Sequence, residues 1–194
     1  LKDEASFEPH SLSALCLWSV MTRMRAPVAK NYQDDKLGKI AEALSPLEKC
    51  FLYATRETPD TFDSESRQIL KMGVEEIQNE YDNDSMYEGK FGISPREVKQ
   101  IIYDLAYAHP TVTFVEVLEY LKELQEKKSE FDFLNISHQN EYHNPKKFID
   151  LIETWCLDLL DTEVRESLGL VDERSYEEYI SKYILSINAL IKGE

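Results

Sequence analysis

The fold class of this chain can be inferred from one stretch, Phe114-Val115-Glu116-Val117-Leu118-Glu119-Tyr120-Leu121-Lys122-Glu123-Leu124. Its apolar residues recur at intervals of three and four, at Phe114, Val117, Leu118, Leu121 and Leu124. That spacing places them on one face of a helix. The positions between them are mostly charged, which is typical of the solvent-facing side of a surface helix. The stretch therefore predicts an amphipathic α-helix.

The same periodicity extends along most of the 194 residues, and no alternating run bounded by turn residues interrupts it. We expect helices at 9–25, 34–44, 46–55, 64–81, 95–108, 114–128, 145–168 and 176–192. The predicted fold class is all-α, a bundle of about eight helices in two packed subdomains with no sheet. The first of these helices is apolar on nearly every side, so we expect it to be buried among the others.

Capping boxes mark three of the predicted helix starts. Each has a serine followed three residues later by a glutamate, at Ser45, Ser94 and Ser175. The dipeptide His109-Pro110 is the favoured boundary between two subdomains, 1–109 and 110–194. Because the chain starts at Leu1 and not at a methionine, we expect it to be a piece of a longer protein.

The charge of the chain argues against nucleic acid as a partner. The net charge is −15, and acidic residues exceed basic ones in both predicted subdomains, whereas phosphate backbones require clustered Lys and Arg. The stretch after Thr113 could suggest a helix-turn-helix, but its polar face carries glutamates where a recognition helix needs basic and amide side chains. No apolar run reaches the length of a membrane span, so we expect no membrane contact.

The three cysteines predict a reducing compartment. Cys16, Cys50 and Cys156 are odd in number and widely spaced, and each lies in an apolar helical pattern. This arrangement favours three buried free thiols over a disulfide framework. We therefore expect a cytoplasmic protein.

The junction from Gly89 to Lys99 is the best candidate for a binding site. Ser94 starts a helix there, and a helix N-terminus presents N–H groups and a positive dipole end to an anion. Arg96 lies in the first turn and Lys99 three residues later on the same face, so the pair could hold a phosphate. The alternative is a solvated Arg96 that pairs with nearby acids. The Gly89–Gly92 loop is expected to let this helix swing.

Two metal sites are weaker hypotheses. Asp82, Asn83, Asp84 and Glu88 hint at a calcium loop, but Met86 occupies a ligand position, so an ordinary acidic turn is favoured.

The second metal hypothesis comprises His138, Glu141 and His143. Their spacing matches no zinc motif, so surface loop residues are favoured.

The sequence also lacks a phosphate-binding loop, the protein-kinase motifs and a nucleophile elbow. It therefore contains no recognisable catalytic set.

Several segments resemble the bacterial PrkA-type serine protein kinase family, whose members contain an AAA+ ATPase. These are Pro9–Leu12, Val20–Met24, Leu44–Lys49, Tyr87–Glu97 and Asp161–Leu170. They follow the family's order along almost the whole chain. The segment Gly92-Ile93-Ser94-Pro95-Arg96-Glu97 is the most specific of them.

The resemblance implies the C-terminal portion of such a protein. Residues 1–109 would be an AAA+ lid-like helical subdomain, and residues 110–194 the PrkA C-terminal helical subdomain. Arg96 would be the sensor-2 arginine, with Ser94 and Lys99 beside it, and would reach ATP that is held with Mg²⁺ by a core upstream. The parent would be an ATP-dependent serine/threonine protein kinase or AAA+ ATPase. The chain alone is expected to be inactive and to bind no ATP tightly.

The resemblance also implies partners. These would be the upstream AAA+ core of the same protein, a protein substrate or client, and further copies in a homo-oligomer. From another functional class, the alternative is a helical protein–protein interaction scaffold with no nucleotide role.

Overall fold

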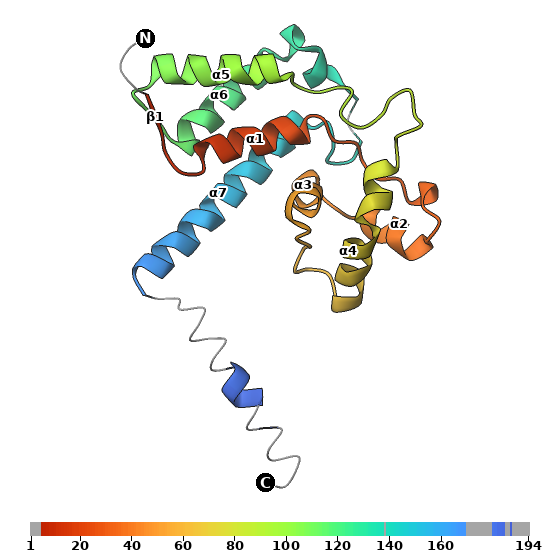
Figure 1. Cartoon of the computed structure of the whole chain (residues 1–194). Coiled ribbons are helices and arrows are strands. Elements are labelled where there is room, and N and C mark those ends of the chain that lie inside the picture. Colours follow the sequence, from red (N-terminus) through yellow and green to blue (C-terminus); the bar gives the residue numbers. More distant parts are fainter. Residues whose placement is uncertain (1–4, 138, 170–179, 185–186, 188–194) are drawn as a thin grey trace. The chain divides into compact units, whose positions relative to one another are not determined.

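The computed structural model describes residues 5–137, 139–169, 180–184 and 187 (Figure 1). The chain divides into two compact units, residues 1–154 and residues 155–194. The expected subdomain boundary at His109–Pro110 falls inside the first unit. Among the described residues, no helix combines the length and the apolar composition that crossing a membrane requires.

Helices make up most of the described chain, as predicted. They are α1 (Ser11–Met21), α2 (Asp35–Glu42), α3 (Pro46–Thr55), α4 (Ser64–Asn79), α5 (Pro95–Ala108), α6 (Phe114–Glu126) and α7 (Pro145–Ser167). Short 3₁₀ turns are η1 (Ala29–Asn31), η2 (Lys128–Glu130) and η3 (Asp132–Asn135). Each of these α-helices lies within a predicted range. The helix predicted at 176–192 falls mostly outside the described residues.

The prediction of no sheet was wrong. Strand β1 (Ser6–Phe7) pairs in parallel with β2 (Thr111–Val112), and Ser6 lies opposite Thr111. The backbone N–H of Ser6 donates to the carbonyl of Pro110 at 3.1 Å, and that of Glu8 to Val112 at 2.9 Å. Strands of two residues are too short to show an alternating pattern, so sequence periodicity could not reveal them. The pairing also links the two sides of the expected boundary.

Side-chain caps fix the helix starts. The predicted boxes at Ser45 and Ser94 are both present, and the one at Ser175 lies outside the described residues. A further box, which the sequence analysis missed, joins Thr113 and Glu116 at the start of α6. Caps of this kind satisfy backbone N–H groups that have no partner inside the helix.

Among its described residues, the first unit has buried side chains in two places. One joins α2, α3 and α4 and includes Leu37, Leu52, Leu70, Val74 and Ile77. The other surrounds α1, which contacts α3 and α6. Its inner face buries Ala14, Leu15, Trp18 and Met21.

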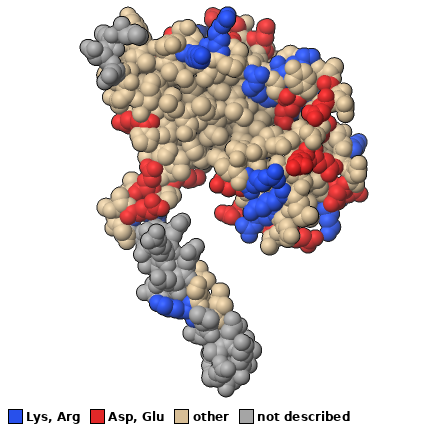
Figure 2. Space-filling view, viewed as in Figure 1, with Lys and Arg blue, Asp and Glu red and all other residues tan. Residues whose placement is uncertain are grey.

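The expectation that the first helix is buried among the others holds for its inner face only. Leu12 and Val20 on α1 are 42% and 45% exposed, and Cys16 between them is also exposed. In Figure 2, which has the view of Figure 1, the surface over α1 is mostly uncharged. Composition predicts that a helix is apolar all round, but neighbouring elements decide which of its faces they cover.

All three cysteines are free, as predicted, but they differ in access. Cys50 and Cys156 are buried and Cys16 is exposed. Burial raises the pKa of Cys50 to about 12 and that of Cys156 to about 11. Because the thiolate is the reactive form, both should resist alkylation in the folded chain.

Iodoacetamide at about pH 8 should therefore modify Cys16 first, because the other two thiols are both protonated and shielded. Peptide mass spectrometry should find the label on Cys16 in the folded chain and on all three cysteines in urea. Early labelling of Cys50 would contradict the packing described for α3.

Candidate functional site

The start of α5 brings the three residues of the predicted phosphate site onto two turns of one helix. The Ser94 backbone N–H donates to Glu97 Oε2 at 2.7 Å, and the Glu97 N–H donates to Ser94 Oγ at 3.3 Å. Pro95 has no N–H. The capping box thus leaves the N–H of Arg96 as the donor that remains for an anion at this helix start. The binding of an anion at this helix start would therefore depend mainly on the charge of nearby side chains.

Arg96 and Lys99 supply that charge. Both are exposed, three residues apart on α5, and neither forms a side-chain ion pair within the described part of the chain. Arg96 is therefore solvated, as in the alternative interpretation, but no nearby acid pairs with it among these residues. The role of Ser94, Arg96 and Lys99 as phosphate ligands remains a prediction.

Residues 22 and 23, which follow α1, hold the loop before α5 through hydrogen bonds that we call the Arg23 clasp. The Arg23 guanidinium donates to the carbonyls of Ile93 at 2.6 Å and Gly89 at 2.5 Å. The Gly89 N–H returns a bond to the Arg23 carbonyl at 2.9 Å, and the Ile93 N–H donates to Thr22 Oγ1 at 3.1 Å. The expectation of a swinging Gly89–Gly92 loop is thus not supported, because both ends of the loop are tied to one segment.

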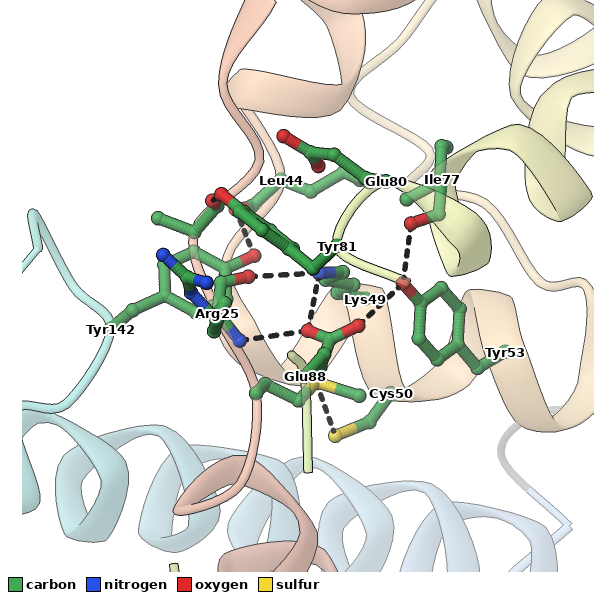
Figure 3. A network of polar contacts seen from close by, with 12 residues as sticks. Arg25, Leu44, Lys49, Cys50, Tyr53, Ile77, Glu80, Tyr81, Glu88 and Tyr142 are labelled. Atoms are coloured by element: carbon green, nitrogen blue, oxygen red, sulfur yellow. Dashed lines mark hydrogen bonds and ion pairs between the residues drawn. The ribbon is translucent and has the colours of Figure 1, made fainter. Parts of the chain in front are cut away.

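A buried ion pair anchors the same loop (Figure 3). The Lys49 side chain on α3 is fully buried, and its Nζ donates to Glu88 Oε1 at 2.6 Å and to the Arg25 carbonyl at 2.8 Å. Glu88 also accepts from the Arg25 N–H at 2.7 Å and from the Tyr53 hydroxyl at 3.0 Å. The two charges therefore satisfy each other and hold three segments of the chain together.

Aromatic rings surround the ammonium group. Its Nζ lies 5.3 Å from the ring centroid of Tyr53 and 5.8 Å from that of Tyr142, within the range of cation–π attraction. Burial lowers the pKa of Lys49, and Glu88 opposes that shift. Burial also raises the pKa of Tyr53, as does the nearby Glu88 carboxylate. The cluster is a structural junction with a single buried charge pair at its centre.

Two acidic residues of the weaker calcium hypothesis contact basic side chains at this junction. Glu88 binds Lys49, and Asp84 pairs with the Arg25 guanidinium at 2.9 Å. That guanidinium also stacks over the Tyr81 ring at 3.8 Å. No group of three metal-ligating side chains occurs among the residues that the structure describes.

The second metal hypothesis stays untested, because His138 lies outside the described residues. Glu141 pairs with Lys147 at 3.1 Å. The expectation of a surface residue was wrong for His143, which is buried.

The sequence analysis missed Lys49 as a core residue. Three of the segments quoted for the family resemblance, Val20–Met24, Leu44–Lys49 and Tyr87–Glu97, meet at this junction. The available signal was a lysine at a helical position that otherwise belongs to the apolar face, three residues before Leu52. A buried lysine requires an anion, and no local pattern shows that the anion is Glu88.

Comparison with known proteins assigns the family. A family model described as the PrkA serine protein kinase C-terminal domain matches residues 47–194. The chain belongs to this family. The match begins at residue 47, so it includes residues 47–109, which the sequence analysis placed in a lid-like subdomain. No curated protein and no solved structure matches the chain significantly.

The buried pair yields a stability prediction. Replacement of Lys49 by Met should lower the free energy of unfolding by about 3–5 kcal/mol, because Glu88 would keep a buried charge without its cation. The Lys49→Met/Glu88→Leu double variant should lose less than the sum of the single variants. Urea unfolding measures each value.

Lys36 provides the matched control. It pairs with Glu65 at 3.0 Å, but both side chains are more than 70% exposed, so Lys36→Met should cost no more than about 1 kcal/mol. Equal losses for Lys36→Met and Lys49→Met would contradict the role assigned to the buried pair.

Alanine substitutions at two glycines of the loop test whether the loop packs against residues 22 and 23. Gly89 and Gly92 both have positive φ, 89° and 119°, so alanine at either should cost about 1–2 kcal/mol in backbone strain. A Cβ on Gly92 would also lie 2.4 Å from Arg23 Cγ and 2.8 Å from the Thr22 carbonyl oxygen, whereas one on Gly89 meets nothing within 4 Å.

Gly92→Ala should therefore destabilise the chain by about 1–3 kcal/mol more than Gly89→Ala. Differential scanning calorimetry of the two variants measures the difference. Identical melting temperatures would show that Gly92 is not packed against residues 22–23.

Proposed function

We propose that this PrkA-family chain is the C-terminal helical, regulatory portion of a PrkA-like AAA+ serine protein kinase, and that α5 is part of a lid over ATP. The nucleotide, with Mg²⁺, would be held by an upstream core of the same protein. Family membership supports the assignment to a PrkA-like protein. The exposed Arg96, without a side-chain partner among the described residues, is the observation that favours the lid role.

The rigidity of the helix start supports this role. The Lys49–Glu88 pair and the Arg23 clasp hold residues 88–93, and the Ser94–Glu97 box fixes the first turn. The root of Arg96 is therefore held in place before any ligand arrives. The backbone at Arg96 would therefore lose little freedom on binding, and the guanidinium can form two parallel hydrogen bonds to a phosphate. In this proposal Ser94 positions Arg96, and Lys99 adds a second charge.

A contact to the terminal phosphate would make the lid sensitive to nucleotide state. That phosphate is present in ATP and absent after hydrolysis, so the lid would bind the two states with different affinity. Such a difference is what a conformational switch requires. Because the loop before α5 is clasped, the lid would move together with the end of α1 and with α3, and not about Gly89–Gly92.

A helical interaction scaffold without a nucleotide role is the second candidate. Tyr103 and Tyr107 lie four residues apart on α5 and are 63% and 82% exposed. Exposed tyrosines at helical spacing favour a protein contact, because Tyr is enriched at interfaces. Such a contact could be made by a client, a substrate or another copy of the chain.

The two candidates differ in what happens when Arg96 is removed from the full-length parent. Arg96→Ala should reduce ATP turnover about tenfold or more, since a charge-assisted hydrogen bond is worth about 1.5–3 kcal/mol and about 1.4 kcal/mol is a factor of ten. A coupled ATPase assay measures turnover, and the melting temperature should barely change because Arg96 is exposed.

Arg67→Ala is the matched control. Arg67 is an arginine of α4 that pairs with the exposed Asp60 at 3.1 Å, and its loss should leave turnover unchanged. Unchanged turnover in Arg96→Ala as well would reject the lid role and favour the scaffold.

A further inference from the structure

A groove of about 280 Å³ lies beside the start of α5. Its walls come from the loop before α5, from the first turn of α5 and from η2 and η3. They include Phe91, Glu97, Glu130, Phe131, Asp132 and Phe133. Pockets for small molecules usually measure about 300–1,000 Å³, so this groove is sized for a single long side chain and not for a nucleotide.

Aromatic rings form the apolar part of the groove. The rings of Phe131 and Phe133 lie 5.8 Å apart and are tilted by 58°. Phe133 also packs edge-on against the buried Trp18 at 6.1 Å, which connects this wall to the core around α1. Phe91 is 42% exposed. Packing thus fixes the rings of Phe131 and Phe133, and all three phenylalanine side chains stay partly accessible to solvent.

Carboxylates form the polar part of the groove. Glu130 and Asp132 are exposed, and neither pairs with a cation among the described residues. Glu97 contributes a third carboxylate, one oxygen of which accepts from the Ser94 N–H.

The lysine in the lining is already engaged. Lys90 Nζ donates to the Ser85 carbonyl at 2.5 Å and lies 5.5 Å from the Phe91 ring centroid. This ammonium keeps its positive charge, but the three carboxylates of the lining outnumber it, so the groove is negative overall. The position of Lys90 also shows that a cation can lie beside the Phe91 ring.

Carboxylates beside aromatic rings are complementary to a cationic side chain, and the guanidinium of arginine fits both kinds of group better than an ammonium does. A guanidinium binds carboxylates through paired hydrogen bonds and stacks on aromatic faces. A phosphate would be repelled here. The net charge of −15 would also attract a basic partner from a distance.

We propose that this groove binds an arginine side chain in a basic segment of a partner protein. The proposal goes beyond the nucleotide role of Arg96 and does not depend on it.

Nuclear magnetic resonance titration of the 194-residue chain tests the proposal. The probe is the peptide acetyl-Ala-Ala-Arg-Ala-Ala-amide, and its matched control carries citrulline, which has the shape of arginine without the charge. The arginine peptide should shift the amide signals of Gly92 and residues 130–133 in a saturable way, without ATP present. The citrulline peptide should bind at least about tenfold more weakly, because the charge-assisted hydrogen bonds are lost.

Two double variants remove equal charge from different places. Glu130→Gln/Asp132→Asn removes both open carboxylates of the groove and should weaken binding of the arginine peptide about tenfold or more. Glu42→Gln/Glu57→Gln removes two exposed carboxylates on other elements and should change the affinity less than twofold.

Equal losses in the two double variants, or shifts spread over the acidic surface, would overturn the proposal. Such a result would mean that the peptide senses net charge and not the groove. Because the titration contains no nucleotide, its failure would leave the lid role of Arg96 untouched. Conversely, normal ATP turnover in Arg96→Ala would leave the arginine groove untouched.

Discussion

The buried ion pair between Lys49 and Glu88 is the interaction on which the arrangement around α5 depends. Its two residues are 39 positions apart in sequence, and the ammonium also binds the carbonyl of Arg25. The fully buried ammonium of Lys49 could not remain in the interior without the Glu88 carboxylate, because desolvation of a lone ion costs several kcal/mol. The pair therefore specifies one packing of α3, the segment after α1 and the loop before α5.

The consequences of this packing reach the surface. The loop that Glu88 anchors continues through Gly89 and Ile93, which Arg23 clasps, and ends at the Ser94 cap. Arg96 follows on a helix start that can adjust little. Few of these contacts involve the exposed face of α5, so changes at Arg96 and changes at Lys49 should be separable, the former in function and the latter in stability.

Two surfaces of opposite charge flank the start of α5. Arg96 and Lys99 carry positive charge on the exposed turns of the helix, and the groove with Glu130 and Asp132 carries negative charge and aromatic rings. An anion and a cationic side chain would each find one complementary surface. In the two proposals made above, the first surface would contact a nucleotide and the second a partner protein.

Local chemistry in the sequence determined the helices and their starts. The three- and four-residue spacing of apolar side chains predicted α2 to α7 closely, and the boxes at Ser45 and Ser94 identified two helix starts, because these signals act within a turn or two. The start of the helix that carries Arg96 and the absence of disulfides between the three cysteines were also predictable from the sequence.

Tertiary structure alone decided the contacts between distant segments. The fold brings together three pairs that are far apart in the chain: β1 with β2, Lys49 with Glu88, and Phe91 with Phe131 in one groove. The exposure of Cys16 likewise depends on which elements pack against α1. Periodicity shows that a helix has an apolar face or that a lysine interrupts it, but not which element covers that face or neutralises that charge. Long-range packing decides both, because the free energy of burial depends on the partner and not on the local pattern.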